Sequence, residues 1–276
     1  MFTRKMLNDN AHLITESAFA FACENWEYMS KPMKFFGSSV KLEKGKDKRD
    51  SYIMYLQPAG KVSRKTLCDG AAMSGCEAAC LIQSGQLGMS VGQRAATKRT
   101  ILMICDPVGF KNSISAEIVK AERKAQKTGI PALFRLNGTS DVDFSDIISE
   151  SPLSEFYDYT KVLSRIRQNT LPNYHITFSG SMYTKQSRNA LVKAVARKYN
   201  IAVAFNTKGL IIDDVIIPSV MVDFDETDLR PMDKPQSIGA LKRKGSSIKS
   251  RKLEGKNSFF VTSANYNDAM DILFGS

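Results

Sequence analysis

Short apolar runs alternate with amphipathic stretches along most of this chain. Helical patterns separate these runs, at Val91–Cys105, Ser113–Lys127, Asp146–Ser149, Lys161–Gln168 and Lys185–Tyr199. The apolar runs are five to seven residues long, the length of buried strands, and lie at Tyr52–Gln57, Ile130–Leu136, Glu155–Tyr159, Tyr174–Phe178 and Ile201–Phe205. Repeated strand–helix–strand order predicts parallel pairing with right-handed crossovers.

The C-terminal part adds a strand-rich stretch from Leu210 to Phe224, a last strand at Ser258–Thr262 and a short helix at Asn267–Phe274. The total of about six or seven strands predicts an α/β fold, a complete or partial β/α (TIM-like) barrel with an N-terminal extension. Residues 1–50 are expected to form a helical extension with a charged connector, KLEKGKDKRD. Residues 51–276 are expected to form the barrel-like domain, with a basic segment at 242–256. Neither a dinucleotide-binding glycine motif nor a P-loop is present.

Three of the five cysteines lie within thirteen residues, in LCDGAAMSGCEAACLIQSGQL (67–87). Because thiolates bind zinc and iron strongly, Cys68, Cys76 and Cys80 predict one metal or iron–sulfur site, with His175 as a candidate fourth ligand. The alternative is that Cys76 and Cys80 are small buried hydrophobic residues. An odd number of cysteines in a chain this long argues against a disulfide framework and for a reducing cytoplasm.

Polar residues lie at the carboxyl ends of the predicted strands, and in a parallel sheet these ends lie at the same edge. The segment Gly138, Thr139, Ser140 and Asp141 follows one strand, and Ser179 ends another. Asp158 and Lys161 lie at the end of the strand between them. We expect Asp141 to act as an acid–base group or to anchor a ligand, with Asp158 and Lys161 as further catalytic candidates. The alternative is that these residues cap the helices that follow.

The chain carries 39 basic and 28 acidic residues, a formal charge of +11 with a pI near 9.4, which favours a polyanionic partner. We expect DNA in preference to RNA, or a nucleotide. Arg94 and Lys98 lie on one side of a predicted helix, and a basic run contains Lys242, Arg243, Lys244, Lys249, Arg251 and Lys252. The run is predicted either to grip phosphates or to be a solvated loop. No stretch is long and apolar enough to span a bilayer.

A cluster of acidic residues, Asp225, Glu226, Asp228 and Asp233, surrounds Arg230. This cluster is expected to bind a hard cation or to form a charged turn in which carboxylates hold Arg230.

Four motifs occur in order: RLNGTSD (135–141), FYDYTK (156–161), NYHITFS (173–179) and DETDLRPMD (225–233). Together they resemble a family of uncharacterised bacteriophage proteins, which implies a phage origin. The cysteine loop and the Gly138–Asp141 segment also resemble radical-SAM-like barrels. That resemblance implies a 4Fe-4S cluster with S-adenosylmethionine, although the spacing of seven and then three residues differs from that superfamily. A likeness to phage DNA transglycosylases implies zinc, with Asp141 and Asp158 as the two aspartates.

These observations predict a phage-encoded enzyme in the host cell cytoplasm that modifies a nucleobase or nucleotide, by radical or base-exchange chemistry. In this hypothesis the cysteines hold the metal, and Lys161 and His175 contact the substrate. The alternative is a non-catalytic nucleic-acid-binding protein in which the cysteines form a zinc staple.

Overall fold

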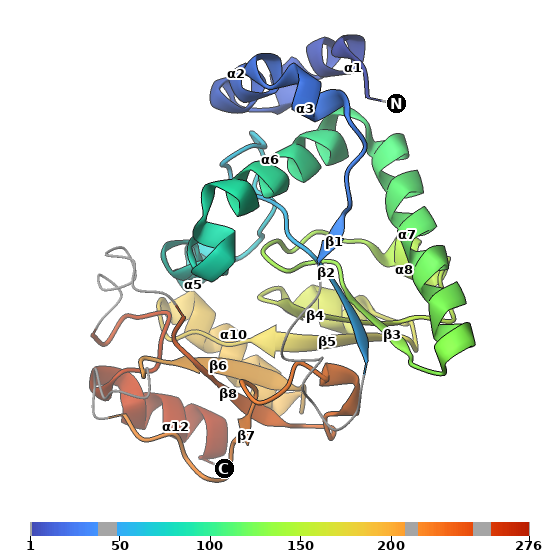
Figure 1. Ribbon diagram of the computed structural model, residues 1–276. Helices are drawn as coiled ribbons and strands as arrows, with labels where there is room; N and C mark the ends of the chain where they lie inside the picture. Colours follow the sequence, from blue (N-terminus) through green and yellow to red (C-terminus); the bar gives the residue numbers. More distant parts are fainter. Residues whose placement is uncertain (1, 38–48, 208–214, 245–254, 276) are drawn as a thin grey trace. The chain divides into compact units, whose positions relative to one another are not determined.

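The computed structural model describes residues 2–37, 49–207, 215–244 and 255–275. Within them, eight strands form one mostly parallel sheet in the order β1-β2-β3-β4-β5-β6-β8-β7 (Figure 1). The edge strands are β1 (Phe36–Gly37), antiparallel to β2, and β7 (Val222–Asp223), parallel to β8. The α/β class is confirmed. A barrel is not, because closure requires the two edges to pair and this sheet is open.

The chain divides into two compact units. Unit 1 comprises Met1–Cys68, Gly85–Phe156 and Leu171–Tyr174, and unit 2 comprises Asp69–Ser84, Tyr157–Thr170 and His175–Ser276. Each unit is described by itself.

The sheet of unit 1 is built around stacked aromatic rings. β2 (Asp50–Met54) pairs in parallel with β3 (Ala132–Arg135), which pairs in turn with the start of β4 (Glu155–Thr160). The ring of Phe134 stacks on Tyr52, with centroids 4.8 Å apart, and on Phe156 at 5.3 Å. Offset aromatic pairs add to the energy of burial, and they tie these neighbouring strands together.

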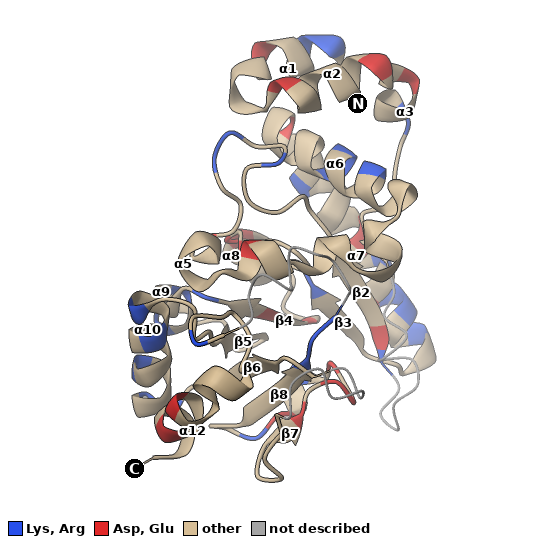
Figure 2. Cartoon of the chain, turned by 90° about the vertical axis from the view of Figure 1, so that its left-hand side faces the viewer, with Lys and Arg blue, Asp and Glu red and all other residues tan. Residues whose placement is uncertain are grey.

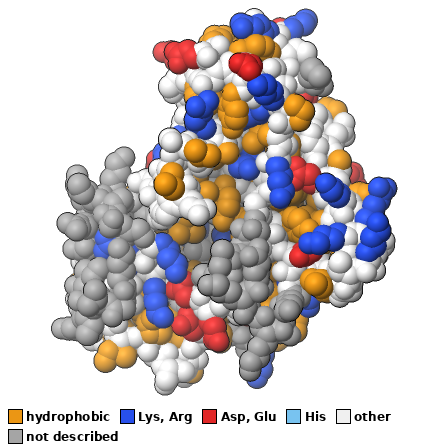
Figure 3. All heavy atoms as spheres, viewed as in Figure 1, with side chains coloured by type: hydrophobic (Ala, Val, Ile, Leu, Met, Phe, Trp, Pro, Cys, Tyr) orange, Lys and Arg blue, Asp and Glu red, His pale blue; other side chains and the backbone are white. Residues whose placement is uncertain are grey.

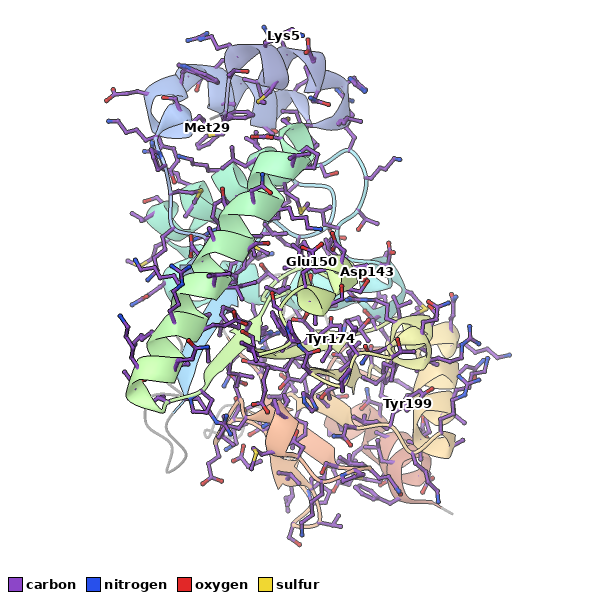
Figure 4. The ribbon with its side chains drawn as sticks, turned by 90° about the vertical axis from the view of Figure 1, so that its right-hand side faces the viewer. Lys5, Met29, Asp143, Glu150, Tyr174 and Tyr199 are labelled. Atoms are coloured by element: carbon purple, nitrogen blue, oxygen red, sulfur yellow. The ribbon has the colours of Figure 1, made fainter. Side chains whose placement is uncertain are left out.

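The helices of unit 1 are α1 (Arg4–Asp9), α2 (Glu16–Glu24), α3 (Trp26–Ser30), α6 (Ser90–Cys105), α7 (Pro107–Thr128) and α8 (Ser145–Ser149), with 3₁₀ turns η1 (Ala11–Leu13) and η4 (Gly85–Gly88). The first three pack on α6 through a cluster that includes Leu7, Met29 and Ile101 (Figures 1 and 4). Lys111 of α7 pairs with Asp146 of α8 and with Glu150.

In unit 2 the strands β5 (Tyr174–Ser179), β6 (Ile201–Phe205) and β8 (Ile238–Lys242) run parallel. One face of these strands is covered by α9 (Leu163–Gln168), α10 (Lys185–Ala196) and α12 (Tyr266–Phe274). All three helices contribute to a single apolar cluster with Phe178, Val203 and Phe205. Tyr199, which follows α10 and is labelled in Figure 4, packs on the same cluster. α9, α10 and α12 therefore lie in one layer.

The other side of β6 and β8 is covered by two irregular segments. One contains α5 (Ala71–Ser74) and the 3₁₀ turns η2 (Cys76–Ala79) and η3 (Leu81–Gln83), and the other contains Phe259 and Phe260. The remaining 3₁₀ turns are η5 (Arg230–Met232) and η6 (Ser263–Asn265).

The acidic cluster is a charged turn. Arg230 is 2% exposed, its guanidinium lies 3.5 Å from the ring centroid of Phe224, and it pairs with Asp233 at 3.2 Å. Burial raises the pKa of the Asp233 carboxyl, and the positive charge of Arg230 partly offsets that rise. Of the four predicted carboxylates, Asp233 pairs with Arg230, whereas Asp225 pairs with Lys244.

Candidate functional site

The carboxyl ends of four strands meet at one edge of the sheet in unit 2. Lys161 follows β4, Ser179 ends β5, Asn206 follows β6 and Arg243 follows β8. The side chains of Lys161 and Ser179 are hydrogen bonded, so the ends of β4 and β5 lie together. Parallel α/β sheets bind ligands outside the carboxyl ends of their strands, so we call this group of residues the strand-edge site.

Lys161 lies between a hydroxyl group and an aromatic ring. Its Nζ donates to Ser179 Oγ at 2.7 Å and lies 4.7 Å from the ring centroid of Phe259. The side chain is half-buried. A cation over an aromatic face is held by the quadrupole of the ring, and partial desolvation strengthens that attraction.

Because Gly70 has no side chain, the Lys161 side chain can pack closely against it. Gly70 has φ +81°, in the left-handed region, and a Cβ there would lie 3.0 Å from Lys161 Cβ. The turn at Gly70 leads into α5. Two hydroxyl groups that follow β5 donate to the last carbonyls of this helix: Ser181 Oγ to Ser74 O and Thr184 Oγ1 to Met73 O. The sequence after β5 thus fixes the segment that packs on Lys161.

Arg243 supplies a second cation at this edge. It is 5% exposed, its Nη1 donates to Asn206 Oδ1 at 2.6 Å, and its guanidinium lies 5.5 Å from the ring centroid of Phe260. A bridge between Phe205 and Val261 carries the Phe259–Phe260 segment along the end of β6. Two cations and two adjacent phenylalanines therefore share the edge.

The predicted metal ligands do not come together. Within the described part of the chain, no three His, Cys, Asp or Glu side chains are grouped so that they could hold a metal ion. Cys68 belongs to unit 1, whereas Cys76, Cys80 and His175 belong to unit 2. The metal or iron–sulfur site therefore stays a prediction, without a ligand cluster in the described residues to support it.

Local geometry explains this outcome within unit 2. Cys76 begins a 3₁₀ turn and Cys80 follows it; in a 3₁₀ turn the side chains that eclipse are three residues apart rather than four. His175 lies at the amino end of β5, the end opposite Ser179.

The Gly138–Asp141 segment is a buried turn of unit 1. Thr139 Oγ1 donates to Leu56 O at 2.6 Å, and Ser140 Oγ donates to Asn137 Oδ1 at 2.8 Å. A Cβ on Gly138 would lie 2.5 Å from the ring of Tyr55. Thr139 and Ser140 are each 7% exposed, and the N–H of Gly138 donates to Met54 O at 2.9 Å, so the segment ties the end of β3 to the end of β2.

The three predicted catalytic residues fall in different units. Asp141 is a half-buried residue of unit 1, and its backbone N–H donates to Leu67 O at 2.8 Å. Asp158 is 1% exposed inside β4, in unit 2 with Lys161. Lys161 contacts the Ser179 hydroxyl and the Phe259 ring at the strand edge.

Most of the predicted phosphate-binding cations are held by other groups. Lys98 is 1% exposed and donates to the carbonyls of Tyr28 and Lys31, so as placed it does not reach a phosphate. Exposed Arg94 donates to Asn25 Oδ1 at 3.0 Å. In the basic run, Lys242 pairs with Asp223 and Lys244 pairs with Asp225, whereas Arg243 points inward. Lys249, Arg251 and Lys252 lie outside the described residues.

Sequence reasoning missed Asn206, Phe259, Phe260 and Gly70. Polar residues after an apolar run could have indicated Asn206, since it follows the predicted strand Ile201–Phe205 directly. Nothing in the sequence places Phe259 over Lys161, because the contact joins positions 98 residues apart.

These features define an α/β protein with an open, mostly parallel sheet and a cationic, aromatic strand edge. A family model described as Gene product 88 matches residues 33–256, and the chain belongs to that family, a phage-type gene product family. No curated protein matches the chain, and no solved structure matches it. Among the described residues no helix is long and apolar enough to cross a membrane.

Proposed function

We propose that this protein binds the phosphate groups of a nucleic acid or nucleotide at the strand-edge site of unit 2. The observation that carries the proposal is the grouping around Lys161: its ammonium lies 2.7 Å from the Ser179 hydroxyl and 4.7 Å from the Phe259 ring. An ammonium and a hydroxyl are donors suited to phosphate oxygens. A half-buried phenylalanine offers a face on which a base can stack.

Arg243 adds a positive charge beneath the site. Its guanidinium is 5% exposed and is held by Asn206 and the Phe260 ring, so it contributes positive potential at this edge rather than a direct contact with the anion. The formal charge of +11 favours the approach of a polyanion. The metal-dependent and base-exchange reactions expected from the sequence are left out of this proposal, because the predicted ligands do not assemble in the described residues.

The test is binding of a fluorescein-labelled single-stranded DNA, followed by anisotropy, with unlabelled nucleotides as competitors. Lys161→Ala removes the ammonium and is expected to weaken binding at least about tenfold, since a charge-assisted hydrogen bond contributes roughly 1.5–3 kcal/mol. Ser179→Ala loses a neutral donor and is expected to have a smaller effect. Phe259→Leu is expected to weaken binding about fivefold or more through lost stacking.

The matched control is Lys124→Ala, which removes a lysine of α7 that pairs with Asp50 in unit 1. Equal losses for Lys161→Ala and Lys124→Ala would show that only net charge matters and would contradict a site at Lys161. Absence of any binding by the unaltered protein at low salt would contradict the function itself.

A further inference from the structure

One long stretch of the chain carries cations without carboxylates. Between positions 161 and 207 there is no Asp or Glu, whereas the basic residues there are Lys161, Arg165, Arg167, Lys185, Arg188, Lys193, Arg197 and Lys198. At the average of 28 acidic residues in 276, a stretch of this length would hold about five. The stretch includes α9, β5, α10 and β6, all of which are described.

The fold brings the exposed members of this set onto one layer of unit 2. α9 and α10 pack on the same apolar cluster, so their outer sides face solvent together. We call the exposed residues Arg167, Lys185, Lys193, Arg197 and Lys198 the cationic helix face. At 100° per residue, Lys185, Lys193 and Arg197 fall within a sector of about 120°. Figure 2 marks basic positions in blue along the ribbon of α10.

Lys193, in the last turn of α10, and Arg197, its C-cap, complement the helix dipole, but helix stability does not account for Lys185 or Lys198. Lys185 is the first residue of α10, where the helix dipole favours an acidic residue, and the first turn holds none. Lys193 and Arg197 are four residues apart, a spacing at which like charges repel. Lys198 has φ +58°, in the left-handed region that favours glycine at a helix end. An anion bound along this face would relieve the repulsion.

We propose that the cationic helix face binds the sugar–phosphate backbone of a nucleic acid, independently of base sequence. This inference rests on the function proposed above and names a second contact for the same ligand. The rise along α10 from Lys185 to Arg197 is about 18 Å, the length of roughly five base-pair steps of duplex DNA.

A nucleic acid fits this face better than an anionic membrane surface. A membrane-bound helix inserts a free apolar side between the lipids. The apolar side of α10 is already used, because Leu191 and Ala194 are fully buried in the core of unit 2. The neighbouring helix α12 carries Asp268, which pairs with Lys256, and Asp271. Val192 is exposed on α10, but a single valine does not form an apolar face, so repeated phosphates complement the row of cations better than lipid does.

The test compares two triple variants of the full chain that carry the same net charge. One removes Lys185, Lys193 and Arg197, each changed to Gln. The control changes Lys120, Arg123 and Lys127 of α7, exposed cations of unit 1, to Gln; Figure 3 shows basic side chains over α7. Binding of a labelled DNA duplex is measured from 50 to 200 mM KCl, with far-ultraviolet circular dichroism to verify folding.

The α10 variant is expected to lose at least about tenfold in affinity at 50 mM KCl. Its plot of log affinity against log salt is expected to be shallower by about 2 to 3 units, since each phosphate contact contributes about 0.9. The control is expected to keep the slope of the unaltered protein. Arg167→Gln, on α9, provides a second variant and is expected to reduce the slope by about one unit.

The outcomes separate this inference from the proposed function. If the unaltered protein binds neither a nucleic acid nor a nucleotide, both fail; if it binds only a nucleotide, only the cationic helix face is overturned. If it binds, and the α10 variant keeps the full salt slope, only the cationic helix face is overturned. Binding to vesicles containing phosphatidylserine that is lost in the α10 variant, with duplex binding unchanged, would overturn the choice of nucleic acid as the ligand of this face.

Discussion

Lys98 and Lys161 are both removed from full solvent exposure, but they contact different groups. Lys98 donates to two backbone carbonyls and lies 4.6 Å from the Tyr28 ring centroid, and burial lowers its pKa. Lys161 contacts a hydroxyl and a ring at a strand end. The sequence identifies both only as basic residues, because Lys98 contacts the carbonyl of Lys31, 67 residues away, and Lys161 contacts the ring of Phe259, 98 residues away. Their roles therefore require the structure.

Cys105 provides a prediction about pH. It is 3% exposed at the end of α6, and burial raises the pKa of its thiol from 9.0 to about 11. The folded protein thus holds this proton more tightly than the unfolded chain does. The corresponding contribution to the free energy of unfolding is complete below pH 9 and is lost as the pH rises toward 11.

Urea unfolding between pH 8 and 11 measures this effect. The unaltered protein is expected to lose stability over that range more steeply than Cys105→Ala, which has no thiol to ionise. Equal pH slopes for the two proteins would show that the thiol does not ionise differently in the folded state. The comparison uses slopes, so the lower overall stability expected from the smaller side chain does not affect it.

At the scale of elements, the apolar pattern predicts β5 and β6 closely, but the strand predicted at Ser258–Thr262 forms only an isolated bridge at Val261. The predicted strand Ile201–Phe205 coincides with β6, and the predicted strand Tyr174–Phe178 is one residue shorter than β5. β8 was missed because its residues, IGALK, run into a basic segment and read as part of it. α7 begins at Pro107, six residues before the predicted start, because Asp106 caps it through the N–H of Gly109.

The cysteine loop is the element for which the prediction and the structure differ most. Its spacing indicated one ligand set, but left-handed glycines at 70 and 75 flank a single turn of helix, and a 3₁₀ turn follows. A spacing in sequence specifies a geometry only when the type of helix is known. The loop instead packs on Lys161 and Tyr183 at the edge of unit 2.

Gly70→Ala tests the role of this loop. The added methyl group would be strained at φ +81° and would press on Lys161 Cβ, so we expect a loss of about 1–2 kcal/mol in the free energy of unfolding and weaker nucleotide binding. Gly85→Ala is the control, because Gly85 also has a positive φ but nothing lies within 4 Å of its added Cβ. Equal effects of the two substitutions on binding would contradict a role for Gly70 in shaping the site.

At the scale of the whole molecule, the excess of positive charge is distributed unevenly. Several cations elsewhere are paired with acids, including Lys111, Lys124, Lys242 and Lys244. The stretch from 161 to 207 has no acid of its own. The net charge of +11 suggests a polyanionic partner as a hypothesis, but it does not indicate which residues would contact that partner. Only the structure, which places α9 and α10 in one layer, shows that the cations of these two helices share a surface.

The central claim is that unit 2 carries the nucleic-acid-binding surfaces. Ultraviolet cross-linking of the full chain to a DNA strand containing 5-iodouracil, followed by mass spectrometry of the linked peptides, tests this claim most directly. We predict cross-links in unit 2, in the segment that contains Phe259 and in residues 161–207. Cross-links confined to unit 1, in residues 85–156, would contradict the account.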